Sequence, residues 1–337
     1  MPGDDRPPVF LWPRQPPRLG YTLRPMTPES CIQSPRRDAV SDQPVDPQAA
    51  AAFPFLLPPA YARKIERARE PDALLRQVLP AAEELRETPG YGVDPLAESP
   101  AERLGLIEKY PGRLLLMVTP ACSGHCRFCF RRHLLDSGPP RDAQVAAFRR
   151  RMDRSGDISE VILSGGDPLV LSDRRLAEWF DEIARYDGVR RIRIHTREPV
   201  FSPRRITPAL AALLAGAPRP VVLAVHVNHA DELDDETAAA LARLRGAGVL
   251  LLTQTVLLRG VNDSVAQLTA LYERAVDCGL APYYLHQLDR VAGAAHFAVA
   301  ADRGRELIRQ LRRSLPGYLV PRYVEEIPGE PGKSPLA

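Results

Sequence analysis

The chain has 337 residues, of which 45% are hydrophobic and 26% charged, and this length is enough to bury a large core. Its 45 basic and 42 acidic residues leave a net charge of +3, and no basic run is interleaved with aromatic residues, so nucleic acid is not an expected partner. No apolar run approaches the ~18 residues that a membrane-spanning helix needs. The first residues, MPGDDRPPVF, also lack the basic start and apolar stretch of a signal peptide.

The N-terminal part of the chain divides into two segments. Fourteen of the 35 prolines lie in the first 60 residues, so residues 1–52 are predicted to form a proline-rich arm that is extended or partly disordered. Residues 53–108 are predicted to be an N-terminal helical region, in which Pro71 and Pro80 interrupt short helical periods.

From residue 113 onward, apolar β-rich segments alternate with helical segments. Strands are expected at 113–119, 158–164, 189–196, 220–227, 248–256 and 281–288. Helices are expected around 142–153, 173–186, 207–215, 236–246, 264–278 and 301–314. Apolar strands that alternate with helices predict a parallel sheet covered by helices. Six such units favour an α/β fold of the partial (β/α)6 TIM-like barrel type over residues 109–315, with a doubly wound sheet as the alternative.

Side chains capable of chemistry lie at or just after the end of each predicted strand. In chain order they are a cysteine group, Ser164 to Asp167, His195 to Arg197, His226 and Asn228, Gln254, and finally His286 and Asp289. In parallel α/β folds the carboxyl ends of the strands form the active face. The sequence therefore predicts one site to which all six strands contribute.

The cysteine group is Cys122, Cys126 and Cys129, with the spacing Cys-x₃-Cys-x₂-Cys. Three clustered cysteines among only five indicate a metal site in a reducing cytoplasm rather than a disulfide framework. Zinc with His125 or His133 as the fourth ligand is one alternative, but structural zinc usually takes two pairs of ligands from two knuckles. A [4Fe–4S] cluster normally takes four thiolates, so three would leave one iron able to bind a small molecule.

This motif, in the loop after the first strand of a partial barrel, resembles the radical S-adenosylmethionine (SAM) superfamily. The resemblance implies that the three cysteines hold a [4Fe–4S] cluster whose open iron binds SAM, which is cleaved to methionine and a 5′-deoxyadenosyl radical. Gly165, Gly166 and Asp167 look like the glycine-rich turn near the methionine part of SAM. Gln254 matches another position near this cosubstrate.

Further motifs are similar to the lysine 2,3-aminomutase family. Six segments occur in the order found in that family: CRFCFRRH, LSGGDPL, TQTVLLRGVND, APYYLHQLDRVAGAAHF, PGYLVPRY and PGEPGKSP. The likeness covers about residues 53–337. The segments FPFLLPPAYARKI, DALLRQVLP and PGEPGKSPLA resemble the short branch that makes (R)-β-lysine for the modification of elongation factor P. The resemblance implies an isomerase that converts (S)-α-lysine to (R)-β-lysine and also uses pyridoxal 5′-phosphate (PLP).

The same resemblance implies which residues contact PLP. Lys333, in the C-terminal segment 316–337, matches the catalytic lysine that carries PLP. A lysine can form that bond only when its amine is deprotonated. Lys109, Tyr110 and His286 match positions that contact PLP, although longer family members have arginine in place of Lys109 and tyrosine in place of His286.

Substrate contacts are implied in the same way. Arg131 matches the arginine that binds the substrate carboxylate, and its guanidinium fork suits a bidentate contact. Asp289 and Glu326 match the acidic pair that binds the ε-ammonium of lysine. Glu326 stands where longer members have aspartate.

The expected partners are L-lysine, an electron donor such as flavodoxin or ferredoxin, and, by resemblance, a β-lysine ligase and elongation factor P. Zinc is not expected, because the cysteine-rich tail of the longer members has no counterpart here and Ser264 replaces a further zinc cysteine. Three alternatives stay open: an aminomutase for another amino acid such as glutamate, a radical SAM enzyme without PLP such as a methylthiolase, and a non-enzymatic iron–sulfur or zinc protein.

Overall fold

The computed structural model describes residues 45–98, 104–134 and 138–337, which belong to one compact unit. The prediction for residues 1–44 lies outside these ranges. Within the predicted extended arm, Pro47–Ala52 form helix α1, which corrects that part of the prediction. The helix begins there because the Asp46 side chain accepts hydrogen bonds from the backbone of Gln48 and Ala49, and because proline is well tolerated at the first helical position.

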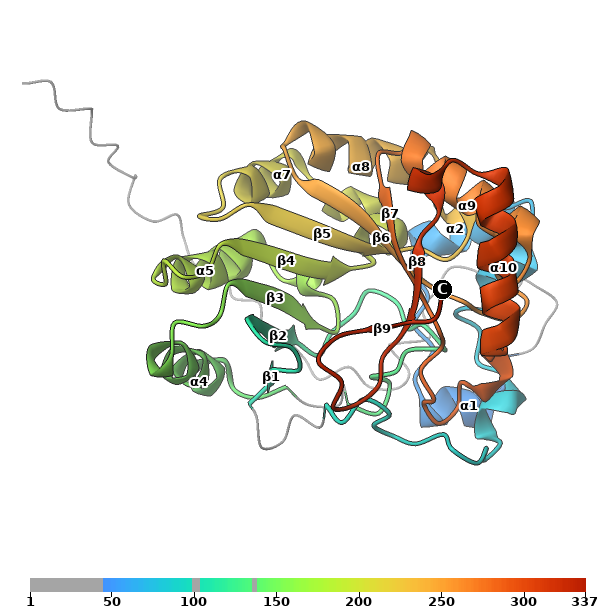
Figure 1. The fold of residues 1–337 in the computed structure, drawn as a ribbon, viewed down its shortest axis with the longest axis horizontal. Coiled ribbons are helices and arrows are strands. Elements are labelled where there is room, and N and C mark those ends of the chain that lie inside the picture. Colours follow the sequence, from blue (N-terminus) through green and yellow to red (C-terminus); the bar gives the residue numbers. More distant parts are fainter. Residues whose placement is uncertain (1–44, 99–103, 135–137) are drawn as a thin grey trace, which may run out of the picture. The chain divides into compact units, whose positions relative to one another are not determined.

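A single sheet forms the centre of the fold, and its strands follow one another in sequence order from β1 to β9 (Figure 1). Seven neighbouring strands are parallel: β2 (Arg113–Thr119), β3 (Glu160–Gly165), β4 (Arg191–Thr196), β5 (Val221–His226), β6 (Leu250–Val256), β7 (Ala281–His286) and β8 (Arg322–Glu325). The six predicted strands are confirmed to within two residues, and β8 adds a seventh from the C-terminal segment. Short antiparallel strands, β1 (Leu106–Ile107) and β9 (Ser334–Pro335), extend the two edges.

Helices cover the outer side of this sheet (Figure 1). They are α4 (Arg141–Arg154), α5 (Asp173–Ala184), α7 (Pro208–Ala215), α8 (Asp235–Gly246), α9 (Val265–Asp277) and α10 (Ala301–Ser314). All six were predicted. Because the strand order never reverses, the sheet is a partial barrel rather than a doubly wound sheet. Within the described ranges, no helix combines the length and apolar character needed to cross a membrane.

Shorter elements occupy the remaining chain. They are α2 (Pro59–Arg67), α3 (Pro71–Leu75), α6 (Glu198–Phe201) and the 3₁₀ segments η3 (Ala82–Leu85), η4 (Pro168–Val170), η5 (Pro203–Arg205), η6 (Ala230–Glu232), η7 (Ala295–Phe297) and η8 (Gly317–Leu319). Helix α2 packs on the loops after β4 and β5, where Tyr61 meets Phe201 edge-on and donates a hydrogen bond to Glu232. The N-terminal helices therefore reach the carboxyl ends of the strands.

Strand alternation separates the core from the barrel interior. In β4, Ile192 and Ile194 are fully buried in the main hydrophobic core, while Arg193 and His195 line the interior pocket. The other parallel strands β2, β3, β5 and β6 behave in the same way, because successive side chains of a strand point to opposite faces. One face of each strand thus packs against the helices, and the other lines the pocket with polar, charged and some apolar side chains.

Candidate active site

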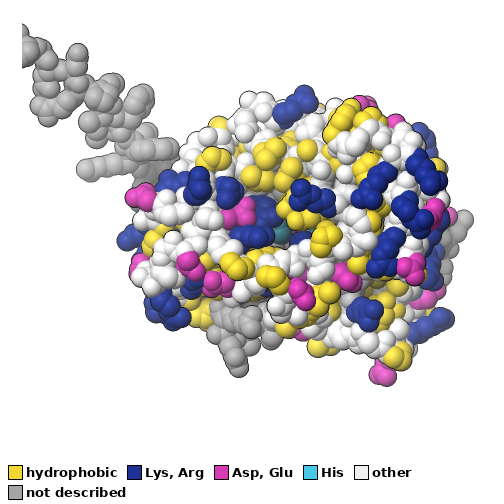
Figure 2. All heavy atoms as spheres, viewed as in Figure 1, with side chains coloured by type: hydrophobic (Ala, Val, Ile, Leu, Met, Phe, Trp, Pro, Cys, Tyr) yellow, Lys and Arg dark blue, Asp and Glu magenta, His cyan; other side chains and the backbone are white. Residues whose placement is uncertain are grey.

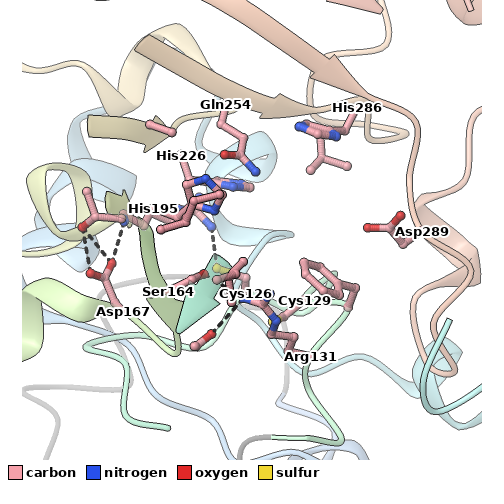
Figure 3. A pocket seen from close by; sticks show the side chains of 18 of the residues that line it. Cys126, Cys129, Arg131, Ser164, Asp167, His195, His226, Gln254, His286 and Asp289 are labelled. Atoms are coloured by element: carbon pink, nitrogen blue, oxygen red, sulfur yellow. Dashed lines mark hydrogen bonds between the residues drawn. The ribbon is translucent and has the colours of Figure 1, made fainter. Parts of the chain in front are cut away.

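All fourteen predicted site residues line one pocket inside the barrel. They are Cys122, Cys126, Cys129, Arg131, Gly165, Gly166, Asp167, Gln254, His286, Asp289, Lys109, Tyr110, Glu326 and Lys333. Figure 2 shows a hollow near the centre of one face, with basic, acidic and histidine side chains inside it. Figure 3 looks into the pocket, with Cys126, Cys129 and Arg131 on one side and His195, His226, Gln254 and His286 on another.

The cysteine loop is held by backbone hydrogen bonds to the N-terminal segment. The backbone nitrogen of His125 donates to the carbonyl of Leu56 at 3.0 Å, and that of Arg127 donates to the carbonyl of Gln77 at 2.8 Å. Burial raises the pKa of the Cys129 thiol to about 11, with Cys126 as a further cause. These hydrogen bonds anchor the loop to the N-terminal segment, and binding of a metal would displace protons from its thiols.

The two histidines considered as zinc ligands point elsewhere. His125 Nδ1 lies 2.8 Å from the carbonyl of Pro54, and its ring stacks on Phe53. His133 Nε2 lies 3.1 Å from the carbonyl of Ala292. Neither histidine lines the pocket. Within the described ranges, no three His, Cys, Asp or Glu side chains converge on a single metal ion.

The glycine-rich turn after β3 packs directly under the cysteine loop. A Cβ atom on Gly165 would lie 2.4 Å from the carbonyl oxygen of Thr119, and one on Gly166 would lie 2.2 Å from that of Ala121. Gly165 also has φ = +116°, which favours glycine. The backbone nitrogens of Gly166 and Asp167 donate to the same two carbonyl oxygens at 2.7 and 2.8 Å. The glycine-rich turn therefore supports the cysteine loop, and this role does not depend on any ligand.

The side chain of Asp167 is occupied within the protein. Its carboxylate accepts hydrogen bonds from the Thr196 hydroxyl and from the backbone nitrogens of Leu169, Arg197 and Glu198. These bonds join the end of β3 to the end of β4. A contact between Asp167 and SAM remains a prediction from resemblance.

A row of alternating charges crosses the pocket wall. Arg131 Nε donates to Glu98 Oε2 at 2.7 Å, and Lys109 Nζ lies 2.8 Å from Glu98 Oε1. Lys109 Nζ also donates to Glu326 Oε1 at 2.6 Å, and Lys333 Nζ donates to Glu326 Oε2. Burial alone would raise the pKa of Glu326, but Lys333 and Lys109 outweigh it and hold the pKa well below its usual range. The predicted carboxylate-binding arginine and the predicted cofactor lysine thus belong to one network.

Asp289 is different, because its carboxylate makes no hydrogen bond or ion pair with any residue in the described part of the chain. It lies on the opposite side of the view from Asp167 (Figure 3). Burial, followed by the nearby charge of Glu326, raises the pKa of Asp289 to about 7, while Lys333 and Lys109 act in the other direction. A partly buried acid without a cation is a candidate ligand-binding group.

Three histidines face the interior in their neutral form. Burial, aided by neighbouring cations, lowers the pKa of His226 to about 3 and holds those of His195 and His286 well below the usual range. The buried Nε2 atoms of His195 and His286 have no hydrogen-bond partner in the described structure. Each of these nitrogen atoms can donate a hydrogen bond to a bound molecule or accept one from it.

Comparisons with known proteins identify the family of this chain. Residues 116–271 match the Radical SAM superfamily. The L-lysine 2,3-aminomutase of Escherichia coli K12 is 41% identical over 291 residues, which cover 86% of this chain and 84% of that protein. The chain belongs to the lysine 2,3-aminomutase family. The L-lysine 2,3-aminomutase of Haemophilus influenzae is 38% identical over 288 residues, or 85% of each chain, and that of Clostridium subterminale is 36% identical over 297 residues, or 86% and 70%.

Membership in this family identifies the protein as an isomerase of the aminomutase type, with a [4Fe–4S] cluster and SAM as cofactors. It favours an enzyme over the non-enzymatic protein that the cysteines alone left open. Among solved structures, a radical SAM methyltransferase from Sphaerobacter thermophilus matches 65% of this chain and 68% of that chain, with 23% identity and a TM-score of 0.45.

The residues fit the cofactors of this family. Three cysteines from one loop line the pocket, and a cluster bonds each thiolate to a different iron, so the sulfurs need to surround it rather than converge on one point. For PLP, the pocket offers the amine of Lys333 and the unpaired Nε2 of His286. Arg113 supplies a cation that has no ion pair within the described ranges and lies over the Tyr110 ring at 5.0 Å.

The sequence analysis did not identify some of the residues that line the pocket. Arg113 and Tyr284 face the interior because of strand alternation, so the strand pattern could have identified them. Glu98 lies outside the barrel strands, and no sequence signal pointed to its position between Arg131 and Lys109.

Proposed function

We propose that this enzyme is a PLP-dependent L-lysine 2,3-aminomutase that converts (S)-α-lysine to (R)-β-lysine. The observation that carries the proposal is Asp289, an acid without a cationic partner in a pocket that also contains Glu326 and Arg131. A molecule with a carboxylate at one end and a second ammonium at the other matches these charges. Glutamate would instead bring a second carboxylate toward two acids.

Arg131 is the proposed partner of the substrate carboxylate. Its Nε is bound by Glu98 and its Nη1 donates to the Ser164 hydroxyl at 2.8 Å, so the buried guanidinium has a fixed orientation. Its Nη2 has no hydrogen bond within the described ranges. This geometry supports one direct contact from Nη2, and the bidentate contact expected from the sequence would require the bond to Ser164 to open.

Glu326 and Asp289 are the proposed partners of the ε-ammonium. Glu326 accepts hydrogen bonds from Lys109 and Lys333. A Lys333 side chain turned away from Glu326 and toward PLP would free one carboxylate oxygen of Glu326 for the substrate. Two carboxylates around one ammonium would then satisfy its donors and offset its loss of water.

Lys333 is the proposed attachment point of PLP, with Lys109, Tyr110 and His286 beside it. Arg113 and Arg193 lie toward the amino ends of β2 and β4, and Arg193 pairs with Glu160 at 2.9 Å, so Arg113 is the proposed source of positive charge for the phosphate. When bound, PLP supplies a conjugated system that stabilises an unpaired electron next to the migrating nitrogen, and SAM supplies the initiating radical. Gly165, Gly166, Asp167 and Gln254 are the proposed SAM contacts.

The wider role rests on similarity to the short family branch. We propose that the enzyme works in a reducing cytoplasm, takes electrons from a flavodoxin or ferredoxin, and passes β-lysine to a ligase that modifies elongation factor P. The likeness of FPFLLPPAYARKI and PGEPGKSPLA to that branch supports this role. We also propose residues 53–108, 109–315 and 316–337 as the N-terminal region, the barrel and the segment that brings Lys333 into the pocket.

The test is anaerobic turnover of L-lysine and L-glutamate by enzyme loaded with cluster, SAM and PLP, with products identified by mass spectrometry. Like charges that meet in a closed site cost several kcal/mol, so lysine should be preferred by roughly 10³-fold or more. Asp289→Asn should remove most lysine turnover, and Asp187→Asn, at a fully exposed side chain, should not. Equal turnover of glutamate would contradict the proposed substrate, and full activity without PLP would contradict the proposed cofactor.

A further inference from the structure

A buried guanidinium lies directly against one of the motif cysteines. Arg197, the residue after β4, donates from Nη1 to the Cys126 sulfur at 2.7 Å. Only 5% of Arg197 is exposed. Its guanidinium carbon lies 4.4, 5.5 and 5.6 Å from the ring centroids of Phe201, Phe128 and Tyr61. Aromatic faces therefore enclose this cation and keep bulk water away from it.

A buried counter-charge fixes Arg197 in this place. Its Nη2 donates to Glu232 Oε1 at 2.5 Å and to Gln77 Oε1 at 2.7 Å. Glu232 also accepts from the Tyr61 hydroxyl at 2.7 Å and from the backbone nitrogen of Asn228 at 2.6 Å. Burial alone would raise the pKa of Glu232, but Arg197 and these hydrogen bonds lower it to about 2. Both members of the pair are therefore charged at neutral pH.

We propose that Arg197 raises the reduction potential of the iron–sulfur cluster through its hydrogen bond and positive charge at Cys126. Reduction adds one electron from a low-potential donor and takes the cluster from [4Fe–4S]²⁺ to [4Fe–4S]⁺, with every iron–sulfur bond intact. A cation beside a ligand sulfur stabilises the more negative, reduced form more than the oxidised form. Hydrogen bonds to the sulfurs and local charge are known determinants of such potentials.

Arg197 has a position that other cations of the pocket lack. Within the described ranges, no other lysine or arginine side chain donates a hydrogen bond to a motif cysteine. The same network includes Tyr61 and Gln77 from the N-terminal helices, so this segment helps to hold the cation at the cluster. Arg197 therefore acts on the cluster through its contact with Cys126.

The experiment measures the midpoint potential of the cluster in the full chain, reconstituted anaerobically without SAM, PLP or lysine. Electron paramagnetic resonance follows the reduced cluster, and iron analysis confirms equal cluster content. Arg197→Gln should lower the equilibrium constant of reduction at least tenfold, which is 59 mV for one electron. Arg197→Lys keeps the charge, so its midpoint potential should fall less than that of Arg197→Gln.

Glu232→Gln is the matched variant, and its midpoint potential is expected to shift in the opposite direction. It removes the anion but leaves the cation at Cys126, so the midpoint potential should rise. A change smaller than twofold in Arg197→Gln overturns the proposal, even if SAM binding weakens, and so does a fall in both variants. If Arg197→Gln holds no cluster, Arg197→Lys decides instead: a potential below that of the unsubstituted protein supports the proposal, and an equal or higher one overturns it. A failure of lysine turnover leaves this measurement unaffected.

Discussion

Replacement of Asp289 by asparagine should stabilise the ligand-free protein while it removes function. The pKa of this carboxyl is raised from its ordinary value of 3.8 to about 7, chiefly by burial and then by Glu326. The folded protein thus keeps a proton that the unfolded chain loses. Its stability falls as pH rises from about 4 to about 7, because the charged form is the one that the pocket accommodates poorly.

The magnitude follows from the pKa values. At 1.36 kcal/mol per pKa unit, the charged carboxylate costs up to about 4 kcal/mol at pH 8, and less than half of that at pH 5. Asparagine carries no charge at either pH. The free energy of unfolding of Asp289→Asn, relative to the unsubstituted protein, should therefore increase by roughly 2 to 3 kcal/mol at most from pH 5 to pH 8. Water inside the pocket screens the charge, so this value is an upper limit.

The assay is anaerobic urea unfolding at several pH values with cluster-loaded protein freed of SAM, PLP and lysine. Asp187→Asn serves as the control, since that side chain is fully exposed. In the loaded enzyme, Asp289→Asn should reduce kcat/KM for lysine at least about 30-fold, because loss of one partner of a buried charge costs about 2 kcal/mol or more. A stability difference that stays constant with pH would refute the reasoning about Asp289.

Four further outcomes are expected. Cys122→Ala should lose the [4Fe–4S] absorbance and SAM cleavage together, and stoichiometric zinc without iron after anaerobic reconstitution would contradict the cluster assignment. Lys333→Ala should keep the iron–sulfur spectrum but lose the PLP that borohydride fixes to the protein; fixation at another lysine would show that the assignment is wrong. Gly166→Ala places a Cβ 2.2 Å from a main-chain oxygen of the cysteine loop, so it should cost at least about 2 kcal/mol and lower cluster content in iron analysis. Because the pKa of Asp289 is about 7, the KM for lysine should rise about tenfold from pH 8 to pH 6 in steady-state assays, and a flat profile would argue against a role for this acid.

Much of the fold follows from local pattern in the sequence. Apolar β-rich runs separated by helical segments placed the six barrel strands to within two residues, since strands of a covered parallel sheet are apolar over most of their length. Several short elements escaped this reasoning, among them β8 and α1. Strand β8 is four residues long, and helix α1 lies in a proline-rich stretch where capping by Asp46 decides the outcome.

Family motifs named the residues of the site, and the structure brought all of them to one pocket. Pattern alone could not show how they pair. Lys109 and Glu326 are 217 positions apart in the chain, and Arg197 and Cys126 are 71 apart. A strand pattern tells which face a side chain occupies but carries no information about its neighbour across the barrel.

The sequence by itself therefore determined the fold class through its order of strands and helices and the cysteine motif through its spacing, and resemblance to family motifs supplied the candidate ligand-binding residues. Only the tertiary structure decided which charges neutralise one another. It paired Glu326 with Lys109 and Lys333, left Asp289 without a cation, and set Arg197 against Cys126. The physical reason is that burial and the distance between charges determine their interaction, and both arise only when the barrel brings distant segments together.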